Sequence, residues 1–243
     1  MAEPTLAGST IITVGGSGTW TGNYDVGSGT DRSLVATIGI YDTSFTDPIT
    51  VSTITYNSTS LGTAKEIAEH QFSAGNNTVK VWSFTLDNPT SGENEFSFAL
   101  SEAVTLCFLT LSHYTGANNG VGTNTAETGG NISDHEYDIT TTDADGVVIQ
   151  AGMTNATRTI TPGTGTTVQE EDLTGTTDSY HWMATESASG STDTVGVTLA
   201  SAARSASCMI ELKAAAAAGG DPEGPLVGGK LVNGGILQGR LIR

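Results

Sequence analysis

The last twenty residues, 224–243, repeat a five-residue pattern that neither regular secondary structure can bury on one side. Each repeat has a glycine, a variable residue, two aliphatic residues and a second variable residue, and the four repeats read GPLVG, GKLVN, GGILQ and GRLIR. A period of five matches neither the 3.6-residue period of a helix nor the two-residue period of a strand. Adjacent side chains of an extended chain point to opposite sides, so each aliphatic pair needs cover on both faces. We therefore predict an assembly arm that is buried against another chain; a frayed terminus is the alternative.

The candidate partner-binding residues of this arm are its aliphatic pairs and its two arginines. They are Leu226, Val227, Leu231, Val232, Ile236, Leu237, Arg240, Leu241, Ile242 and Arg243. Full burial of an aliphatic side chain contributes roughly 1.5–3 kcal/mol, so burying all four pairs would give a gross term above about 10 kcal/mol. The cost of ordering the arm removes much of that term.

Charge divides the chain into an acidic body and a basic end. Of 26 acidic and 9 basic residues, two acids and three bases lie beyond residue 220, which leaves 24 acids and six bases before it. Such a body should repel nucleic acid, because phosphate binding needs a basic footprint. The arm could dock on an acidic surface, such as the body of a sister chain. Solubility, or a salty medium, explains the acidity equally well.

The body is rich in Thr, Ser, Gly and Val, with short alternating apolar runs between Gly, Asn and Asp clusters, which is typical of antiparallel sheets. The predicted strands are 9–14, 19–26, 33–41, 49–56, 64–72, 78–87, 93–100, 103–113, 135–141, 146–153, 156–161, 165–171, 179–187, 193–200 and 205–213. A short helix over 63–70 is an equal alternative to a strand there, and 116–131 reads as a Gly/Asn-rich loop. We predict an all-β fold, an antiparallel β-sandwich of two sheets that is jelly-roll-like, with an extended C-terminal arm.

The domain organisation follows from two changes in composition. We expect residues 1–213 to form one sandwich domain, residues 214–223 to form an Ala/Gly/Pro linker, and residues 224–243 to form the arm. Five alanines are far too few for a self-sustaining helix, so the linker should have no regular structure of its own. The alternative is a pair of small sandwiches that divide within the loop 116–131.

One domain is favoured because 205–213 reads as a core strand of the sandwich that 103–113 helps to build. Alternation places Cys208, Ile210 and Leu212 on one face of this strand and Met209 and Glu211 on the other.

The two cysteines, Cys107 and Cys208, lie in apolar strands. We expect buried thiols, and a disulfide is the alternative if the two strands are neighbours. The chain starts with neither a secretory signal nor a membrane-spanning run, so we expect synthesis in the cytoplasm and no membrane partner.

No motif in the sequence predicts chemistry. The four histidines fall on separate predicted elements, and no HExxH, CxxC or Cys/His cluster is present. The densest set of potential ligands, 134–136 (Asp-His-Glu), is explained as well by a solvated strand end. The turn 143–146 lacks the later acid of a calcium loop. Adjacent Glu170 and Glu171 face opposite sides of a strand, which does not suit glycoside hydrolysis. We predict no catalytic residues, no metal, no cofactor and no enzymatic activity.

Aromatic side chains are the other candidate contacts. Trp182, with Tyr180, is the best candidate for an exposed ring that stacks on a sugar. Trp82 shares its face with Phe84 and Leu86, so we expect it in the core.

Two segments resemble known proteins. The stretch from Val79-Lys80-Val81-Trp82 through Asn88-Pro89-Thr90-Ser91-Gly92 to SFALSEAVTLCFLTLSHYTGA resembles a β-sandwich family of phage genomes and bacterial surface proteins. The end, GGKLVNGGILQGRLIR, resembles Gly/aliphatic/Arg tails on structural proteins of tailed bacteriophages. Together they imply a virion component, either a head decoration (cement) protein or a part of the tail.

The resulting functional hypothesis is a non-enzymatic virion structural protein, most readily a capsid decoration protein that docks through its arm. The implied partner is the major capsid protein or another virion protein, and a homo-oligomer, first of all a trimer, is expected. The alternative is a carbohydrate-binding adhesin module of a phage tail, fibre or capsid surface.

Overall fold

The computed structural model describes residues 3–14, 18–43, 48–72, 77–117, 120–156, 159–172 and 179–216. These residues form fifteen strands and no helix: β1 (Thr5–Thr13), β2 (Thr19–Val26), β3 (Ser33–Asp42), β4 (Val51–Tyr56), β5 (Thr59–Ser60), β6 (Glu66–Phe72), β7 (Asn77–Asp87), β8 (Gly92–Leu100), β9 (Leu106–Thr115), β10 (Val121–Thr140), β11 (Val147–Thr154), β12 (Ile160–Pro162), β13 (Thr167–Asp172), β14 (Tyr180–Ser187) and β15 (Thr192–Leu212). Within these ranges, no helix has the length and apolar character to cross a membrane.

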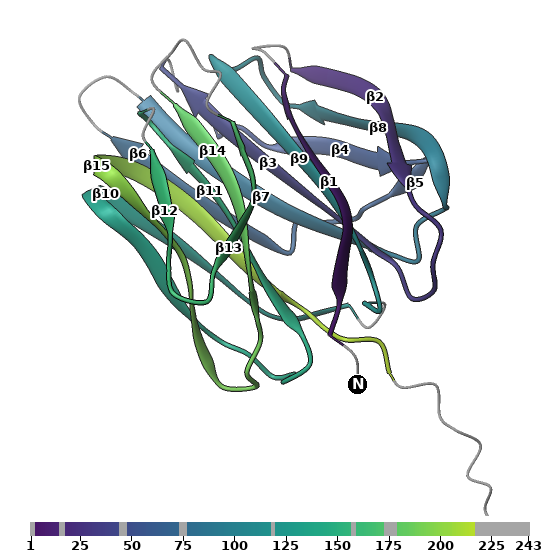
Figure 1. Cartoon of the computed structure of the whole chain (residues 1–243). Helices are drawn as coiled ribbons and strands as arrows, with labels where there is room; N and C mark the ends of the chain where they lie inside the picture. Colours follow the sequence, from purple (N-terminus) through teal and green to yellow (C-terminus); the bar gives the residue numbers. More distant parts are fainter. Residues whose placement is uncertain are drawn as a thin grey trace, which may run out of the picture.

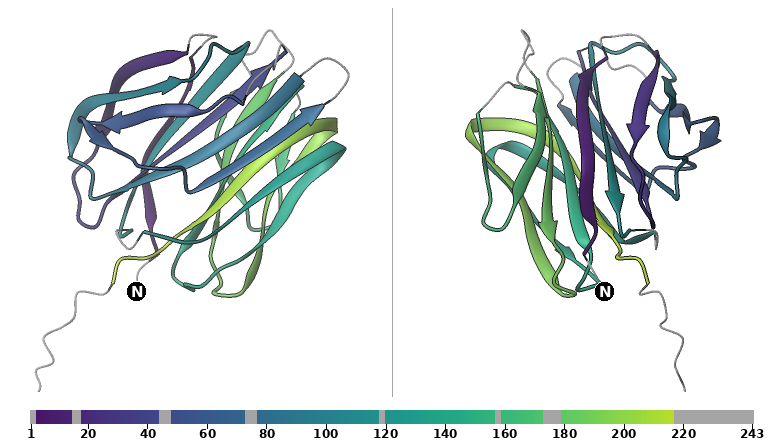
Figure 2. Two further views of the ribbon diagram at one scale, coloured as in Figure 1. Left: turned by 180° about the vertical axis from the view of Figure 1, so that it is seen from behind. Right: turned by 45° about the vertical axis from the view of Figure 1, so that its right-hand side comes forward.

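The strands form three antiparallel sheets, which we name A, B and C. Sheet A has the order β1-β9-β3-β7-β6, sheet B the order β2-β8-β4-β5, and sheet C the order β10-β15-β11-β14-β13 with β12 paired to β15. The first nine strands make sheets A and B, and the last six make sheet C. Sheet A lies between the other two, as the right-hand view of Figure 2 shows.

Sheet A is buried on both faces because it is covered on both. In its central strand β3 all ten residues are buried. Leu34 and Ile38 point into the core shared with sheet B, where they meet Phe96 and Phe98 of β8. Val35, on the opposite face, packs in the core shared with sheet C. A strand buried on both sides does not alternate between buried and exposed residues; the face of β3 toward sheet B is apolar, whereas the face toward sheet C carries Ser33 and Thr37 beside Val35.

The space between sheets A and C is closed along both edges by side-chain hydrogen bonds. At one edge β1 meets β13, where Ser9 donates to Glu170 Oε1 (2.5 Å) and Thr13 donates to Asp172. At the other edge Asn124 of β10 donates to Glu66 of β6 (2.6 Å). The two sheets therefore enclose a common interior.

Strands β10 and β15 form a long two-stranded ribbon that bends back over the outer face of sheet C. The first half of β10 pairs with the second half of β15, and the second half of β10 pairs with the first half of β15. After the bend the two ends of β10 meet, and Thr123 Oγ1 donates to the Thr140 carbonyl (2.7 Å). A side chain at Gly129, at the bend, would clash with Ser205 and His135.

A buried carboxylate fixes this return of the ribbon. Glu211 of β15 is fully buried and accepts hydrogen bonds from the backbone N–H groups of Thr123 (2.9 Å), Thr142 (2.8 Å) and Asp143 (2.6 Å). Burial alone would raise the pKa of the Glu211 carboxyl, but the hydrogen bonds from Thr142, Asp143 and Thr123 outweigh it and lower the pKa. The side chain thus joins the beginning of β10 to the segment that follows its end.

The all-β antiparallel sandwich is confirmed, although the described residues form three sheets instead of two; the jelly-roll form stays a prediction. The predicted loop 116–131 is wrong, because β10 begins at Val121 and pairs with β15. In the segment 63–70, where helix and strand are equal alternatives from sequence, the residues from Glu66 onward belong to strand β6. The faces of 205–213 are confirmed: Cys208, Ile210 and Leu212 pack in the cores between sheets A and C, while Met209 lies in the core on the outer side of sheet C.

Cys107 and Cys208 are free, buried thiols, as expected. Cys107 points into the core between sheets A and B, and Cys208 into the core between sheets A and C, so the backbone of sheet A separates them. Trp82 lies in the core between sheets A and B with Phe84, also as expected.

The predicted linker begins with two residues that are still bound to the body. Ala214 N donates to Asp143 Oδ2 (3.1 Å) and Ala215 N donates to the Gly116 carbonyl (2.7 Å). The chain is therefore held to the body as far as Ala215, at the same end of the molecule as the start of β1 (Figure 1).

Candidate functional site

The predicted arm contacts lie outside the described residues, which end at Ala216. These residues are Leu226, Val227, Leu231, Val232, Ile236, Leu237, Arg240, Leu241, Ile242 and Arg243. Their role as partner contacts stays a prediction.

The expectation that Trp182 is an exposed ring is wrong. Trp182 and Tyr180 are both fully buried, because the returning ribbon covers the face of β14 that carries them. Trp182 Nε1 donates to Gln150 Oε1 (2.9 Å) and the Tyr180 hydroxyl donates to Glu171 Oε2 (2.5 Å). Neither ring offers a free face to a sugar.

A pocket opens where β1 and β13 part, at the end of the seam between sheets A and C. Each of these edge strands carries a β-bulge there: Ala7 is the extra residue between Leu6 and Gly8 in β1, and Gln169 is the extra residue between Val168 and Glu170 in β13. A bulge bends its strand and redirects a side chain. Beyond the bulges the two strands are joined by Ser9 and Glu170; before them the seam is open.

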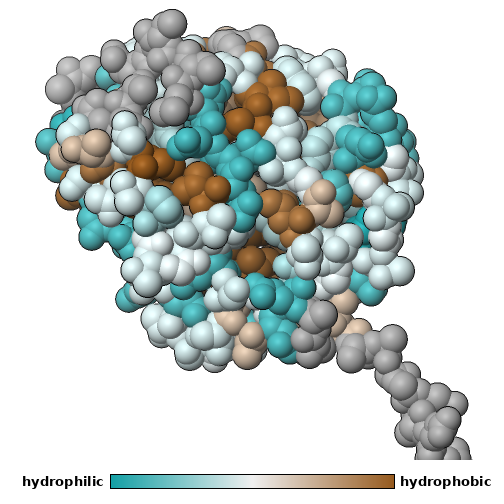
Figure 3. All heavy atoms as spheres, in the orientation of Figure 1, coloured by the Kyte–Doolittle hydropathy of each residue, from teal (hydrophilic) through white to brown (hydrophobic). Residues whose placement is uncertain are grey.

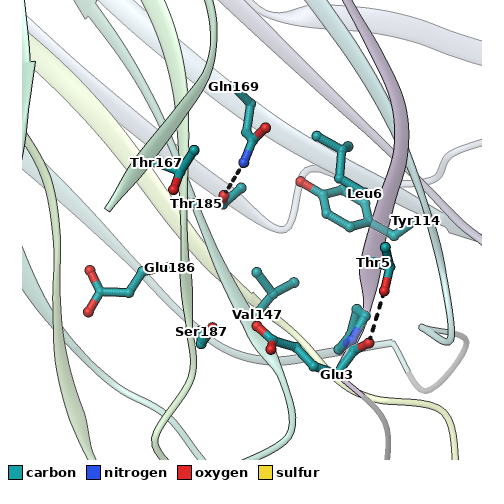
Figure 4. A pocket seen from close by; sticks show the side chains of 11 residues that line it. Glu3, Thr5, Leu6, Tyr114, Val147, Thr167, Gln169, Thr185, Glu186 and Ser187 are labelled. Atoms are coloured by element: carbon teal, nitrogen blue, oxygen red, sulfur yellow. Dashed lines mark hydrogen bonds between the residues drawn. The ribbon is translucent and has the colours of Figure 1, made fainter. Parts of the chain in front are cut away.

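This seam pocket has a volume of about 370 Å³ and a mostly polar lining. It is lined by Glu3, Pro4, Thr5, Leu6, Tyr114, Val147, Thr167, Gln169, Thr185, Glu186 and Ser187, which come from β1 and the residues before it, β9, β11, β13 and β14 (Figure 4). Gln169 Nε2 donates to Thr185 Oγ1 (2.7 Å), which leaves the carbonyl oxygen of the same amide as an acceptor. No Lys or Arg is among the described residues that line it.

Tyr114 supplies a buried polar atom to the lining of the seam pocket. The residue is 1% exposed, and its hydroxyl has no hydrogen-bond partner in the part of the chain that the structure describes. Burial raises the pKa of the Tyr114 phenol, and the nearby Ser112 hydroxyl offsets part of this rise without reaching hydrogen-bonding geometry. Ser112 Oγ instead lies 3.5 Å from Met183 Sδ. Figure 4 shows the hydroxyl pointing toward Gln169 and Thr185.

A second concave site, which we call the β6 groove, is apolar. Sheet B does not extend over β6, so Ile67 stays 47% exposed although it is the cross-strand neighbour of Trp82. The groove has a volume of about 350 Å³ and is lined by Thr50, Val51, Ser52, Gly62, Thr63, Ala64, Ile67, Lys80, Trp82 and Phe84. Its charged end is already paired, because Lys80 Nζ contacts Glu69 (2.5 Å).

The remaining candidate ligands are not brought together. No group of three or more His, Cys, Asp or Glu side chains within the described ranges is arranged to hold a metal ion. His135 is buried and bonded to Ser205 (2.8 Å), instead of standing with Asp134 and Glu136 at an open strand end. Asp143 stabilises its own turn, as Asp145 N donates to its carboxylate (3.0 Å).

Glu170 and Glu171 also have separate structural roles. Glu170 accepts from Ser9 and Glu171 from Tyr180, so the two carboxylates lie on opposite sides of β13. The prediction that these adjacent acids face opposite sides of the strand is confirmed.

Comparison with known proteins gives no match: no protein-family model fits the chain, and neither the curated proteins nor the solved structures contain a significantly similar one.

The face drawn in Figure 3 is mostly polar, with apolar side chains in separate patches.

Proposed function

We propose that this chain is a non-enzymatic structural protein of a tailed-phage particle, most readily a capsid decoration protein, which docks on a neighbouring chain through its arm, residues 224–243. The observation that carries the proposal is a contrast between body and arm. Among the described residues only Ile67 and Ile132 are large hydrophobic side chains left exposed. The arm, by comparison, carries eight aliphatic residues in a pattern that cannot bury itself.

The β6 groove supports a sister chain as the docking partner. It is apolar, it is concave, and it includes one of the two exposed hydrophobic residues, Ile67. β6 is also the edge strand of sheet A, and an edge strand can accept an extended peptide as an additional strand. The arm has no acidic residue after Glu223 and carries Lys230, Arg240 and Arg243, whereas the body is strongly acidic, so the charges are complementary.

The first experiment compares the mass of the full chain with that of a chain lacking residues 219–243 by light scattering. We expect a trimer that becomes a monomer, and we expect the shortened chain to lose co-sedimentation with phage capsids. The truncation lies beyond Ala215, the last described residue with a backbone hydrogen bond to the body, so it leaves the body intact. The proposal fails if both oligomeric state and particle binding are unchanged.

Two full-length variants then separate the parts of the proposal. Ile67→Asp puts a charge into the groove and should reproduce the effect of truncation if a sister body receives the arm. Ile132→Asp is the matched control, because Ile132 is exposed to a similar degree (40% against 47%) on another strand. If assembly is lost on truncation but kept in Ile67→Asp, the arm is needed for assembly but the β6 groove is not the surface that receives it.

The alternative function, a carbohydrate-binding module, no longer rests on Trp182 and Tyr180. The seam pocket is the feature that favours it, because its lining is rich in hydroxyl and amide groups.

A further inference from the structure

We infer that the seam pocket binds a neutral, hydroxyl-rich ligand the size of a single sugar ring, such as the terminal residue of a neutral polysaccharide. The inference rests on the carbohydrate-binding alternative and is independent of the arm. Arm deletion therefore tests the docking proposal alone, and the variants below test this one alone.

The first argument is the unused hydroxyl of Tyr114. A buried polar group without a partner is costly, and such groups in native proteins call for an explanation. Tyr114 lines a pocket that is open to solvent at its mouth, and its hydroxyl oxygen is itself covered, so a ligand oxygen reaches it only when the neighbouring side chains move aside. A phenol both donates and accepts hydrogen bonds, as does each hydroxyl of a sugar.

The second argument is the geometry that makes the pocket. Two bulges, at Ala7 and Gln169, fall on the two facing edge strands at the same end of the seam. The bulge in β13 places the Gln169 amide over the pocket, where Thr185 fixes its orientation through the 2.7 Å hydrogen bond. The ligand would therefore meet an oriented amide carbonyl opposite the Tyr114 hydroxyl, both held by strands instead of loops.

The third argument is the chemistry of the lining, which selects the ligand class. Phosphate, sulfate and acidic sugars are disfavoured because no Lys or Arg lines the pocket and Glu3 and Glu186 do. An amine is less suited than a polyol at the centre of the pocket, because Glu186 accepts a hydrogen bond from Thr166 (3.0 Å) and is directed away from Tyr114, and Glu3 lies at the opposite end of the pocket from Gln169 (Figure 4). Pro4, Leu6 and Val147 offer apolar contact to the C–H face of a ring. The volume of about 370 Å³ is at the small end for ligand pockets, which suits one ring.

The test is a titration of the full-length, ¹⁵N-labelled protein with neutral methyl hexosides, followed by NMR. We expect shifts confined to residues around Tyr114, Gln169 and Thr185, with a Kd on the order of 1 mM, as befits a small ligand. Tyr114→Phe keeps the ring and removes the hydroxyl, and it should weaken binding about fivefold, the effect of one hydrogen bond. Gln169→Leu should weaken it similarly, and Ile67→Ser, in the β6 groove, should leave it unchanged.

Four results would overturn the inference. They are no shift with any neutral hexoside, shifts that map to another surface, equal affinity of wild type and Tyr114→Phe, and tighter binding of methylamine or a uronic acid than of the hexosides. Thermal unfolding of each variant without ligand shows whether it is folded, so a loss of binding cannot be confused with a loss of structure.

Discussion

The interior between sheets A and B and the interior between sheet C and the returning ribbon are built from different chemistry. The first is filled with aromatic and aliphatic side chains such as Phe96, Phe98 and Ile38. The second contains a chain of buried polar groups. Trp182 Nε1 donates to Gln150, and Gln150 Nε2 donates to the His135 carbonyl (3.1 Å).

The difference shows what each region has to specify. Apolar packing is non-directional, and it suffices where two sheets of short strands face each other. The ribbon has to stop, bend and return at one position, and hydrogen bonds give that position because they depend on direction as well as distance. Some buried polar groups form their hydrogen bonds only when the ribbon has returned over sheet C. These hydrogen bonds favour the observed strand register over a register shifted along the chain. The interior between sheets A and B is thus held by apolar contact, and the interior under the ribbon by apolar contact together with directed hydrogen bonds.

The largest expected effect separates the two tryptophans that cover glycines. The ring of Trp182 lies over Gly152 of the neighbouring strand and is fully buried, whereas the ring of Trp20 lies over Gly22 of its own strand and is half-buried. We expect Trp182→Ala to reduce the free energy of unfolding by about 3–5 kcal/mol. Trp20→Ala should cost about 1–2 kcal/mol, since less apolar surface is lost. Urea denaturation measures both, and equal costs would contradict the comparison.

A smaller effect is expected at the carboxylate that fixes the ribbon. Glu211→Gln keeps the size of the side chain but replaces one acceptor oxygen by a donor, opposite backbone N–H groups of Thr142 and Asp143. Hydrogen bonds to a charged group contribute about 1.5–3 kcal/mol, so we expect a loss of about 3 kcal/mol. The control is Glu93→Gln on the exposed face of sheet B, where little change is expected.

Acid should reveal the same carboxylate. The pKa of Glu211 is lower in the folded chain than in the unfolded chain. The contribution of the Glu211 carboxylate to the free energy of unfolding is therefore present above the pKa of the unfolded chain, near 4.5. It is lost as the pH falls through the pKa of the folded chain. Glu211→Gln should have a flatter stability profile below pH 4.5 than wild type, and parallel profiles would argue against this role.

The strands of the first half could be predicted from sequence because they are locally consistent. The run 19–26 was predicted with the bounds that β2 has, since apolar and polar residues alternate there between turn residues. The first half of β10 could not be predicted. Residues 121–131 are rich in Gly, Asn and Thr, and their strand form depends on pairing with β15, some eighty residues later in the chain.

The candidate sites were even less accessible to prediction. The sequence predicts Trp182 at the surface, because the sequence of one strand does not show which other segment covers that strand. In the structure the covering segment is the ribbon that bends at Gly129. The seam pocket depends on bulges at Ala7 and Gln169, and neither residue type signals a bulge. The β6 groove depends on the unequal widths of two sheets, which is a property of topology.

The histidine between sheets A and C gives the next expected effect. His181 is fully buried against Phe108, and burial lowers its pKa to about 4. The unfolded chain binds the proton from about pH 6.5 downward while the folded chain does not, so stability is complete above pH 6.5 and falls as the pH drops toward 4. We expect a loss of about 2 kcal/mol between pH 6.5 and 5.

Denaturation in urea at pH 7.5 and pH 5 measures this loss. His181→Gln should remove the part of the difference that comes from His181, because glutamine does not titrate; burial also lowers the pKa of His113 and His135, which contribute the rest. His70→Gln is the control, since His70 is only half-buried on an edge strand. If His181→Gln keeps the full pH dependence of the wild type, groups other than His181 cause that dependence.

The smallest effect compares two buried tyrosine hydroxyls, one in each interior of sheet A. The Tyr56 hydroxyl donates to the Gly92 carbonyl (2.9 Å), so Tyr56→Phe should cost about 1 kcal/mol. The Tyr114 hydroxyl has no partner among the described residues, so Tyr114→Phe should cost nothing or stabilise slightly in thermal unfolding. An equal cost at both positions would mean that the Tyr114 hydroxyl is bound to ordered water. With a neutral hexoside present, the Tm of wild type should exceed that of Tyr114→Phe, because the bound sugar gives the Tyr114 hydroxyl a hydrogen bond that phenylalanine cannot form.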